Sequence, residues 1–269
     1  GSEIDKKRAN ANIVMGRFLY ALKQDTDYEI ISYEGGQKDN AITREAVCEI
    51  LVAREDIEAV KACAAKAEKG IREEYAGTDS NITVQITEEG YAETDVLHPT
   101  SREKVLFYLV QIPFGIQKMS GNIEGLVETS TNIGIVKLSD DEFFARSSVR
   151  SSVEVARDAL SDKIQYLTEF LGGEYEIQGA YPAWEYRKDS PLRDKMVSVY
   201  EEMYGQKPEV VAIHAGLECG LFYKKIEGLD CVSLGPNMKG IHTSEEVLDI
   251  ASTERVWNYL VKVLEQLKD

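Results

Sequence analysis

Histidine, cysteine and long apolar runs are all scarce in this sequence of 269 residues, which has three histidines and four cysteines. No apolar run approaches the ~20 residues that span a bilayer, and the start, GSEIDKKRAN, lacks the apolar core of a signal peptide. We therefore expect neither a membrane span nor a secretory leader. The cysteines form no CxxC pair and no dense framework, which favours reduced thiols in a cytoplasmic protein.

Basic residues are also few beside acidic ones, with 31 Lys and Arg against 47 Asp and Glu and a net charge of -16. Such a surface repels phosphate backbones and anionic lipid heads, so nucleic acid and membrane are poor candidate partners. Apolar residues make up 43% and charged residues 29%, which is typical of a globular protein. At roughly 150 residues per domain, the length suggests about two domains.

Up to residue 178 the sequence alternates between helical and strand-like periodicity. Capping-box patterns at 100–103 and 151–154 each predict the start of a helix. The order of hairpin and helix recurs, so we expect an α+β domain at 1–178 built of two similar antiparallel halves. The other predicted helices are 10–23 and 56–75, and the predicted strands are 28–33, 45–53, 82–86, 126–138 and 143–149.

From residue 179 to 269 the pattern differs and favours part of an α/β domain. The short apolar runs 210–213 and 231–234 do not alternate with polar residues, which is typical of strands covered on both faces. So few strands do not complete an independent sheet, and a missing partner sheet is implied. The predicted helices of this part are 191–204, 217–225 and 252–267.

Any site that needs imidazole must use one of the three histidines. His98 precedes a proline and is interpreted as a surface residue. His214 ends an apolar run, where ligands gather in α/β sheets, although a structural histidine bonded to backbone is an equal alternative. His242 follows the second run in a loop rich in glycine and could bind a metal, but one histidine is not a metal site, and no further ligands stand at convincing spacing.

Nucleophiles and phosphate loops are weakly supported. Cys219 and Cys231 lie near His214 in the sequence, so a Cys-His hydrolase is conceivable, but buried structural cysteine is the favoured interpretation. No GxSxG, Walker or GxGxxG pattern occurs. Gly134 is interpreted as a strand bulge and not as a phosphate cradle.

One polar residue could bind a small anionic ligand, and a second polar residue is interpreted as part of a turn. Arg150 follows the predicted strand 143–149, and its guanidinium could hold a carboxylate through two parallel hydrogen bonds; a surface salt bridge is the alternative. Asn40 lies in a polar stretch and is by default a turn residue.

Several segments together resemble the aminoacyl-histidine dipeptidases, also called Xaa-His or cytosol nonspecific dipeptidases, of the M20 clan of zinc peptidases. They occur in the same order along essentially the whole chain, which makes the resemblance specific. The segments are 10–12, 35–36 with 39–46, 127–134, 179–184, 214–222 and 233–236.

The resemblance implies that 1–178 is a lid and dimerisation domain and that 179–269 is the C-terminal part of the catalytic domain. It implies a homodimer formed through the lid, and an active site whose two zinc ions, with Mn or Co as alternatives, activate the water that attacks a dipeptide. The part of the family that carries most zinc ligands and the general base has no counterpart here. We therefore expect the chain alone to be inactive.

By the same resemblance, His242 is the last zinc ligand, and Asn40 and Arg150 hold the substrate's C-terminal carboxylate or polarise the scissile carbonyl. Gly216 and Glu218 line the substrate cleft, and no residue of this chain is implied to be the catalytic acid or base. Thr43 stands where relatives frequently have proline, a departure that bears on substrate preference. A non-catalytic dimerisation or peptide-binding module is the alternative function.

Overall fold

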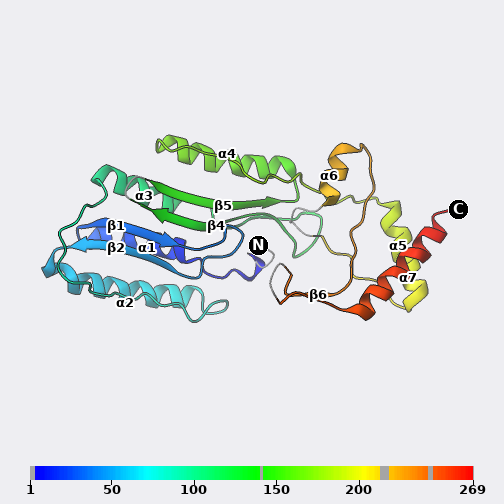
Figure 1. Cartoon of the computed structure of the whole chain (residues 1–269), viewed down its shortest axis with the longest axis horizontal. Coiled ribbons are helices and arrows are strands. Elements are labelled where there is room, and N and C mark those ends of the chain that lie inside the picture. The colour runs from blue at the N-terminus through cyan, green and yellow to red at the C-terminus, as the bar shows by residue number, and fades with distance from the viewer. Residues whose placement is uncertain (1–3, 140–141, 213–217, 242–244, 269) are drawn as a thin grey trace. The chain divides into compact units, whose positions relative to one another are not determined.

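The computed structural model describes residues 4–139, 142–212, 218–241 and 245–268. They form two compact units, the first reaching Ala180 and the second beginning at Tyr181. No helix within these ranges is both long and apolar enough to cross a membrane. Figure 1 gives the element labels used below.

The first unit is built on a five-stranded antiparallel sheet. Strand β4 is its longest member; it pairs with β1, β3 and β5, and β1 also pairs with β2. The predicted mixed α/β fold with an antiparallel sheet is therefore confirmed. The helices are η1 (Ile4–Lys6), α1 (Ala11–Asp25), η2 (Arg54–Asp56), α2 (Ile57–Glu74), α3 (Pro99–Gln111) and α4 (Glu154–Phe170). The strands are β1 (Tyr28–Gly35), β2 (Ala46–Val52), β3 (Gly115–Met119), β4 (Val127–Leu138) and β5 (Phe143–Ser151).

One apolar core joins the sheet to helices α1 to α4, which Figure 1 shows running beside it. Leu19 of α1, Ile30 of β1 and Ile133 of β4 are at most 1% exposed. Gly16 lets α1 approach α3 closely, because a Cβ at this position would lie 2.8 Å from the Cβ of Leu109. The core thus fixes β1, which leads into the loop discussed below, and β4, which carries Asn132.

The predicted strand 82–86 is wrong, although its side chains do alternate between half-buried and exposed. Side chains of α2 take the place of a partner strand. The carboxylate of Glu68 accepts a hydrogen bond from the backbone N–H of Val84 at 2.8 Å, and Nε of Arg72 donates to the carbonyl oxygen of Ile82 at 2.6 Å. These two backbone groups therefore find their partners without a β-ladder.

Both predicted capping boxes are also wrong in detail, although each helix forms. The N-cap of helix α3 is His98 and not Thr100, two residues earlier, and the helix begins at Pro99; Nδ1 of His98 accepts from the N–H of Thr100 at 3.2 Å. Proline fits the first helical position because that N–H has no partner within the helix. The N-cap of α4 is Val153, and Ser151 instead ends β5.

The second unit contains α5 (Pro191–Tyr204), α6 (Glu218–Lys225), β6 (Met238–Lys239), β7 (Val247–Leu248) and α7 (Ile250–Gln266). Helices α5 and α7 enclose a small core of Met196, Val199, Tyr259 and Val263. The predicted strands at 210–213 and 231–234 are wrong for the residues described there, which are irregular, and Val211 is 67% exposed. An apolar run becomes a strand only if another strand pairs with it, and none does in the described part of this unit.

Asp230 completes the N-cap of α5. Its carboxylate accepts hydrogen bonds from Oγ of Ser190 at 2.7 Å and from the N–H of Leu192 at 3.0 Å. Desolvation would raise the pKa of Asp230, but these hydrogen bonds and the charges of Arg187 and Arg193 outweigh it, so the pKa lies below its ordinary value of 3.8.

This lowered pKa predicts acid sensitivity. The carboxylate of Asp230 stabilises the fold above about pH 4, and that stabilisation is lost as the pH falls through the lowered pKa. We expect Asp230→Asn to cost the second unit about 1 kcal/mol at pH 7 and to flatten the dependence of its stability on acid pH. Both tryptophans, Trp184 and Trp257, lie in this unit, so denaturant titrations followed by tryptophan fluorescence measure it. Glu201→Gln, an exposed change on α5, is the control; equal losses would contradict the role of Asp230.

Candidate functional site

The loop of Asn40 joins β1 to β2 and is attached to β4 on both sides of Asn40. The side-chain amide of Asn132 donates hydrogen bonds to the carbonyl oxygens of Asp39 at 3.3 Å and Ala41 at 2.8 Å. Asn132 is 6% exposed, whereas Asn40 is exposed. An exposed loop tip is therefore held by a network of buried polar side chains.

The network of buried polar side chains extends to the N-terminus of α1. Nδ2 of Asn10 donates to Oδ1 of Asn132 at 3.0 Å and to the carbonyl oxygen of Ile133 at 2.9 Å, while Oδ1 of Asn10 caps α1 by accepting from the N–H of Asn12 at 2.9 Å. Both Asn10 and Asn12 are 0% exposed. Buried amides must find hydrogen-bond partners, and these do so with one another and with the sheet.

Thr43 holds the far end of the loop. Its hydroxyl lies 3.0 Å from the carbonyl oxygen of Gly134 and 3.1 Å from Nδ2 of Asn12. The hydroxyl of Tyr33 donates to Oδ1 of Asn12 at 3.1 Å, and burial raises the pKa of Tyr33, so this donor stays protonated. The loop is thus anchored at Asp39, Ala41 and Thr43.

Two glycines make room for the loop. The pairing of β4 with β5 shifts register between Ile133 and Ile135, so the predicted bulge at Gly134 is confirmed. A Cβ at Gly134 would lie 2.4 Å from the carbonyl oxygen of Asp39, and Gly36 has a φ of +80° and would place a Cβ 1.9 Å from the carbonyl oxygen of Gly134. Neither contact is possible for a side chain, so the loop packs on bare backbone.

Arg150 lies on β5 opposite Ser130 of β4, and two residues along the same pair Ser148 lies opposite Asn132. Directly opposed residues share a face of the sheet, and so do residues two apart. Arg150 therefore shares the face of Asn132, to which the Asn40 loop is bound. Its side chain is half-buried, and within the described ranges its guanidinium has no hydrogen-bond or ion-pair partner. The alternative of a surface salt bridge thus gains no support.

The remaining site candidates lie in the second unit or outside the described residues. Glu218 is the first residue of α6 in the second unit and is exposed. Gly216, His242 and His214 lie outside the described residues. No group of three His, Cys, Asp or Glu that could hold a metal ion occurs in the part of the chain that the structure describes.

Comparison with known proteins agrees with the sequence patterns. Residues 1–79 match the family model for the M20 peptidase dimerisation domain. Over 267 residues the chain is 30% identical to the cytosol non-specific dipeptidase of Escherichia coli (strain K12), covering 99% of this chain and 55% of that protein. The crystal structure of aminoacylhistidine dipeptidase from Vibrio alginolyticus matches with a TM-score of 0.90 and 31% identity, covering 99% of this chain and 54% of that one.

The chain is a relative of the M20 dipeptidases. The resemblance predicted from the sequence is thus confirmed, and the structural match extends it to the fold. This M20 relative spans about half the length of the two dipeptidases that it matches.

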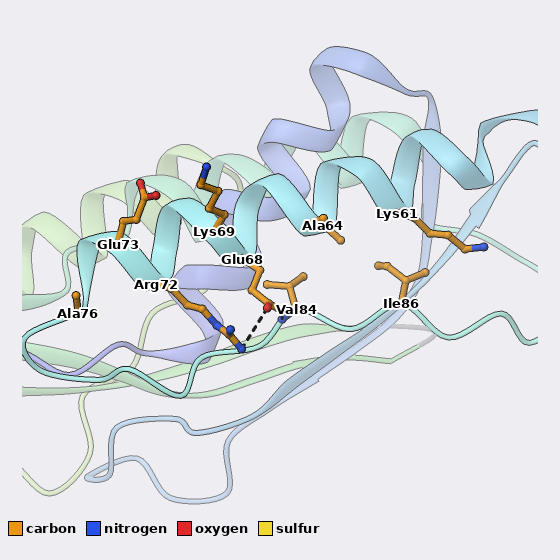
Figure 2. A pocket seen from close by; sticks show the side chains of 10 residues that line it. Lys61, Ala64, Glu68, Lys69, Arg72, Glu73, Ala76, Val84 and Ile86 are labelled. Carbon is orange, nitrogen blue, oxygen red and sulfur yellow. Dashed lines mark hydrogen bonds and ion pairs between the residues drawn. The ribbon is translucent and has the colours of Figure 1, made fainter.

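A groove elsewhere on this M20 relative, between α2 and residues 82–86, has a different character. Figure 2 shows Lys61, Glu68 and Arg72 along α2, with Val84 and Ile86 facing them. The charges are already used: Arg72 pairs with Glu68 at 3.2 Å, and Lys61 pairs with Glu58 and Glu88. The groove is therefore the contact by which the irregular segment 82–86 is attached to α2. It contains none of the predicted site residues.

The cysteine alternative is not supported by the chemistry of the thiols. Sγ of Cys231 lies 4.0 Å from the carbonyl oxygen of Cys219, and desolvation, together with the neighbouring Cys219, raises the pKa of Cys231. A nucleophilic cysteine needs a lowered pKa. The raised pKa of Cys231 therefore does not favour a nucleophile, and the predicted burial is found only in part, since Cys219 and Cys231 are both half-buried.

Sequence reasoning missed the network of buried polar side chains that holds the Asn40 loop. Asn10, Asn12 and Asn132 were noted only as parts of matching segments, and Thr43 only as a departure. One signal was present: an asparagine inside a helix or a strand is costly when it is buried unless its amide is bonded, so Asn12 and Asn132 indicate a buried polar network.

Proposed function

We propose that this chain is the lid and C-terminal portion of a metal-dependent M20 dipeptidase that hydrolyses Xaa-His and other dipeptides. The observation that carries the proposal is the sheet face shared by Arg150 and the anchored Asn40 loop. One residue offers a guanidinium without a partner in the described structure, and the other stands on a loop that cannot easily shift. Such a pair suits a small substrate with a terminal carboxylate.

In this proposal each residue has a separate task. Arg150 binds the substrate's C-terminal carboxylate and sets its register, and the amide of Asn40 stabilises the carbonyl oxygen as it becomes negative. Gly216 and Glu218 are further assigned to the lining of the substrate cleft. We assign residues 1–178 to the lid and 179–269 to the catalytic domain.

Zinc is the proposed cofactor, with manganese or cobalt as alternatives, and it would supply an activated water. The described residues do not fit a complete metal site, since they include no group of three ligands. We therefore assign this chain one ligand, His242, and the other ligands to a complementary part.

Two observations favour a complementary part and a second copy of the chain. In the second unit, Ile250 is 82% and Trp257 65% exposed on α7, as expected of a helix that another part of a domain covers. The match of residues 1–79 to a dimerisation domain favours a homodimer through the lid. The name of the Escherichia coli relative supports a cytoplasmic location.

The proposal is tested by comparing this chain with a version extended upstream to the length of its relatives. We expect the extended protein to retain metal after gel filtration and to hydrolyse alanyl-histidine, with loss of activity in chelator, and the chain alone to do neither. Metal content by mass spectrometry and amino-acid release are the measurements.

Each other outcome selects a different conclusion. An extended protein that holds no metal and cleaves nothing would refute the dipeptidase, and dipeptide binding without hydrolysis would favour a peptide-binding module. Chelator-sensitive hydrolysis by the homogeneous chain alone would show that no complementary part is needed.

A further inference from the structure

We propose that Asn132, oriented by Asn10, is a positioning residue that presets the Asn40 loop for substrate. This inference rests on the proposed function for the role of Asn40, but the mechanical step within the chain can be tested without substrate. It concerns the path of hydrogen bonds from the N-terminus of α1 through β4 to the two peptide groups beside Asn40.

The contact of Asn132 with the loop is bidentate. One amide nitrogen donates to the carbonyl oxygens of Asp39 and Ala41, at 3.3 and 2.8 Å, so both neighbours of Asn40 are bonded to a single side chain. A carboxamide carries two N–H donors, and here both are used. Rotation of the Asn40 backbone would have to break at least one of these bonds.

Only one orientation of the Asn132 amide satisfies its neighbours. Oδ1 of Asn10 accepts from the N–H of Asn12, which turns Nδ2 of Asn10 toward Oδ1 of Asn132. If the Asn132 amide were flipped, two NH₂ groups would face each other and the carbonyl oxygens of the loop would face an oxygen. The capped helix α1 therefore determines which way Asn132 points.

The packing adds a second, independent constraint on the same loop. Gly134 lies directly beneath it: a Cβ there would be 2.4 Å from the carbonyl oxygen of Asp39 and 2.5 Å from that of Lys38. The backbone of Gly134 thus limits how closely the loop can approach β4, and the hydrogen bonds of Asn132 keep the loop from moving away. A loop fixed in this way loses little freedom when substrate binds, which favours both binding and catalysis.

The mechanical step is tested by amide hydrogen exchange on the chain as it stands. The N–H of Ala41 donates to the carbonyl oxygen of Lys38 at 3.3 Å and reports whether the loop is closed. Asn132→Ala leaves two carbonyls without their donor and should speed exchange at Ala41 by roughly 10- to 100-fold, with α2 unchanged. Gly134→Ala should do the same by pushing the loop, although it removes no hydrogen bond.

Thr131→Val is the matched control. Thr131 is the neighbour of Asn132 on β4 and is 1% exposed, and its hydroxyl is buried without a hydrogen-bond partner in the described structure. The change is nearly isosteric and removes an unsatisfied group, so it should not weaken the fold. Exchange at Ala41 should stay at the wild-type rate. Faster exchange in this control as well would mean that any change in β4 opens the loop, which would overturn the proposal.

If Asn132→Ala does not fold, Asn10→Ser addresses the same path. Serine still caps α1 by accepting from the N–H of Asn12, but it cannot donate to Oδ1 of Asn132. Exchange at Ala41 should rise by a smaller factor, because the Asn132 amide keeps its contacts but is no longer oriented. Wild-type exchange at Ala41 in every folded variant of Asn132, Asn10 and Gly134 would refute the positioning role.

The link to substrate is tested in the extended protein by a double-mutant cycle. We expect Asn132→Ala to lower kcat/KM for alanyl-histidine about tenfold, but to lower it no further when Asn40→Ala is already present. Independent, additive losses would show that Asn132 acts by stability alone. If Asn40→Ala leaves kcat/KM unchanged, the assigned role of Asn40 is wrong, and the exchange data still decide whether Asn132 fixes the loop.

Discussion

Arg150→Ala should raise the KM for dipeptides roughly 10- to 150-fold in the extended protein, with a smaller effect on kcat and no change in metal content. The guanidinium is half-buried and has no partner in the described structure, so it is available to a carboxylate. Hydrogen bonds to a charged group contribute about 1.5–3 kcal/mol, which corresponds to this range. The carboxylate does not react, so its loss of binding is equal in the ground and transition states and appears in KM.

Arg146→Ala is the control for the loss of one positive charge. Arg146 is an exposed residue of the same strand, and its guanidinium lies over the ring of Phe144 and donates to Gln178. Arg150→Lys should recover only part of the loss, because an ammonium cannot form two parallel bonds to a carboxylate. A rise in KM for Arg146→Ala equal to that for Arg150→Ala would indicate a general electrostatic effect, and unchanged kinetics would remove Arg150 from the site.

Helices with a strong apolar periodicity were predicted well. Residues 10–23, 56–75 and 191–204 were expected to be helical, and α1, α2 and α5 cover nearly the same ranges. In these segments the apolar face both forms the helix and buries it, so local sequence and tertiary packing agree. The antiparallel strands β1, β2, β4 and β5 were found for the same reason.

The errors occurred where a distant residue decides the outcome. Residues 82–86 alternate as a strand does, but their hydrogen bonds go to Glu68 and Arg72 of α2. The capping-box pattern at 100–103 was overridden by Pro99, which suits the first helical turn and moved the cap to His98. In both cases the pattern was genuine, but another group satisfied the backbone.

The site could be predicted only in part. Asn40 and Arg150 were selected through the family resemblance, but the sequence does not specify the register that pairs Ser130 with Arg150 and Asn132 with Ser148. Nor does it reveal the partners of a buried asparagine, because the local sequence around an N-cap or a strand residue does not identify the distant loop to which its side chain is hydrogen-bonded. The network became visible only when α1, β4 and the β1–β2 loop were placed together.

Gly36→Ala is expected to destabilise the first unit by about 3 kcal/mol or more. Two costs combine: alanine is strained at a φ of +80°, and its Cβ would lie 1.9 Å from the carbonyl oxygen of Gly134. The variant Gly115→Ala measures the cost of the backbone strain without the steric clash, since Gly115 has the same φ of +80° and no atom lies within 4 Å of its Cβ position. That control should lose only the backbone term, roughly 1–2 kcal/mol.

The measurement is denaturant unfolding followed by far-ultraviolet circular dichroism, which reports both units, and by tryptophan fluorescence, which reports the second unit; the first unit is the part of the transition that appears only in circular dichroism. The difference between the two variants measures the crowding at Gly134, whose carbonyl oxygen also accepts from the hydroxyl of Thr43 at 3.0 Å. To remove the clash in Gly36→Ala, either the β4 bulge at Gly134 or the end of the Asn40 loop at Thr43 must therefore move. If Gly36→Ala loses no more stability than Gly115→Ala, the β4 bulge yields freely, and the close fit of the loop to bare backbone does not constrain Asn40.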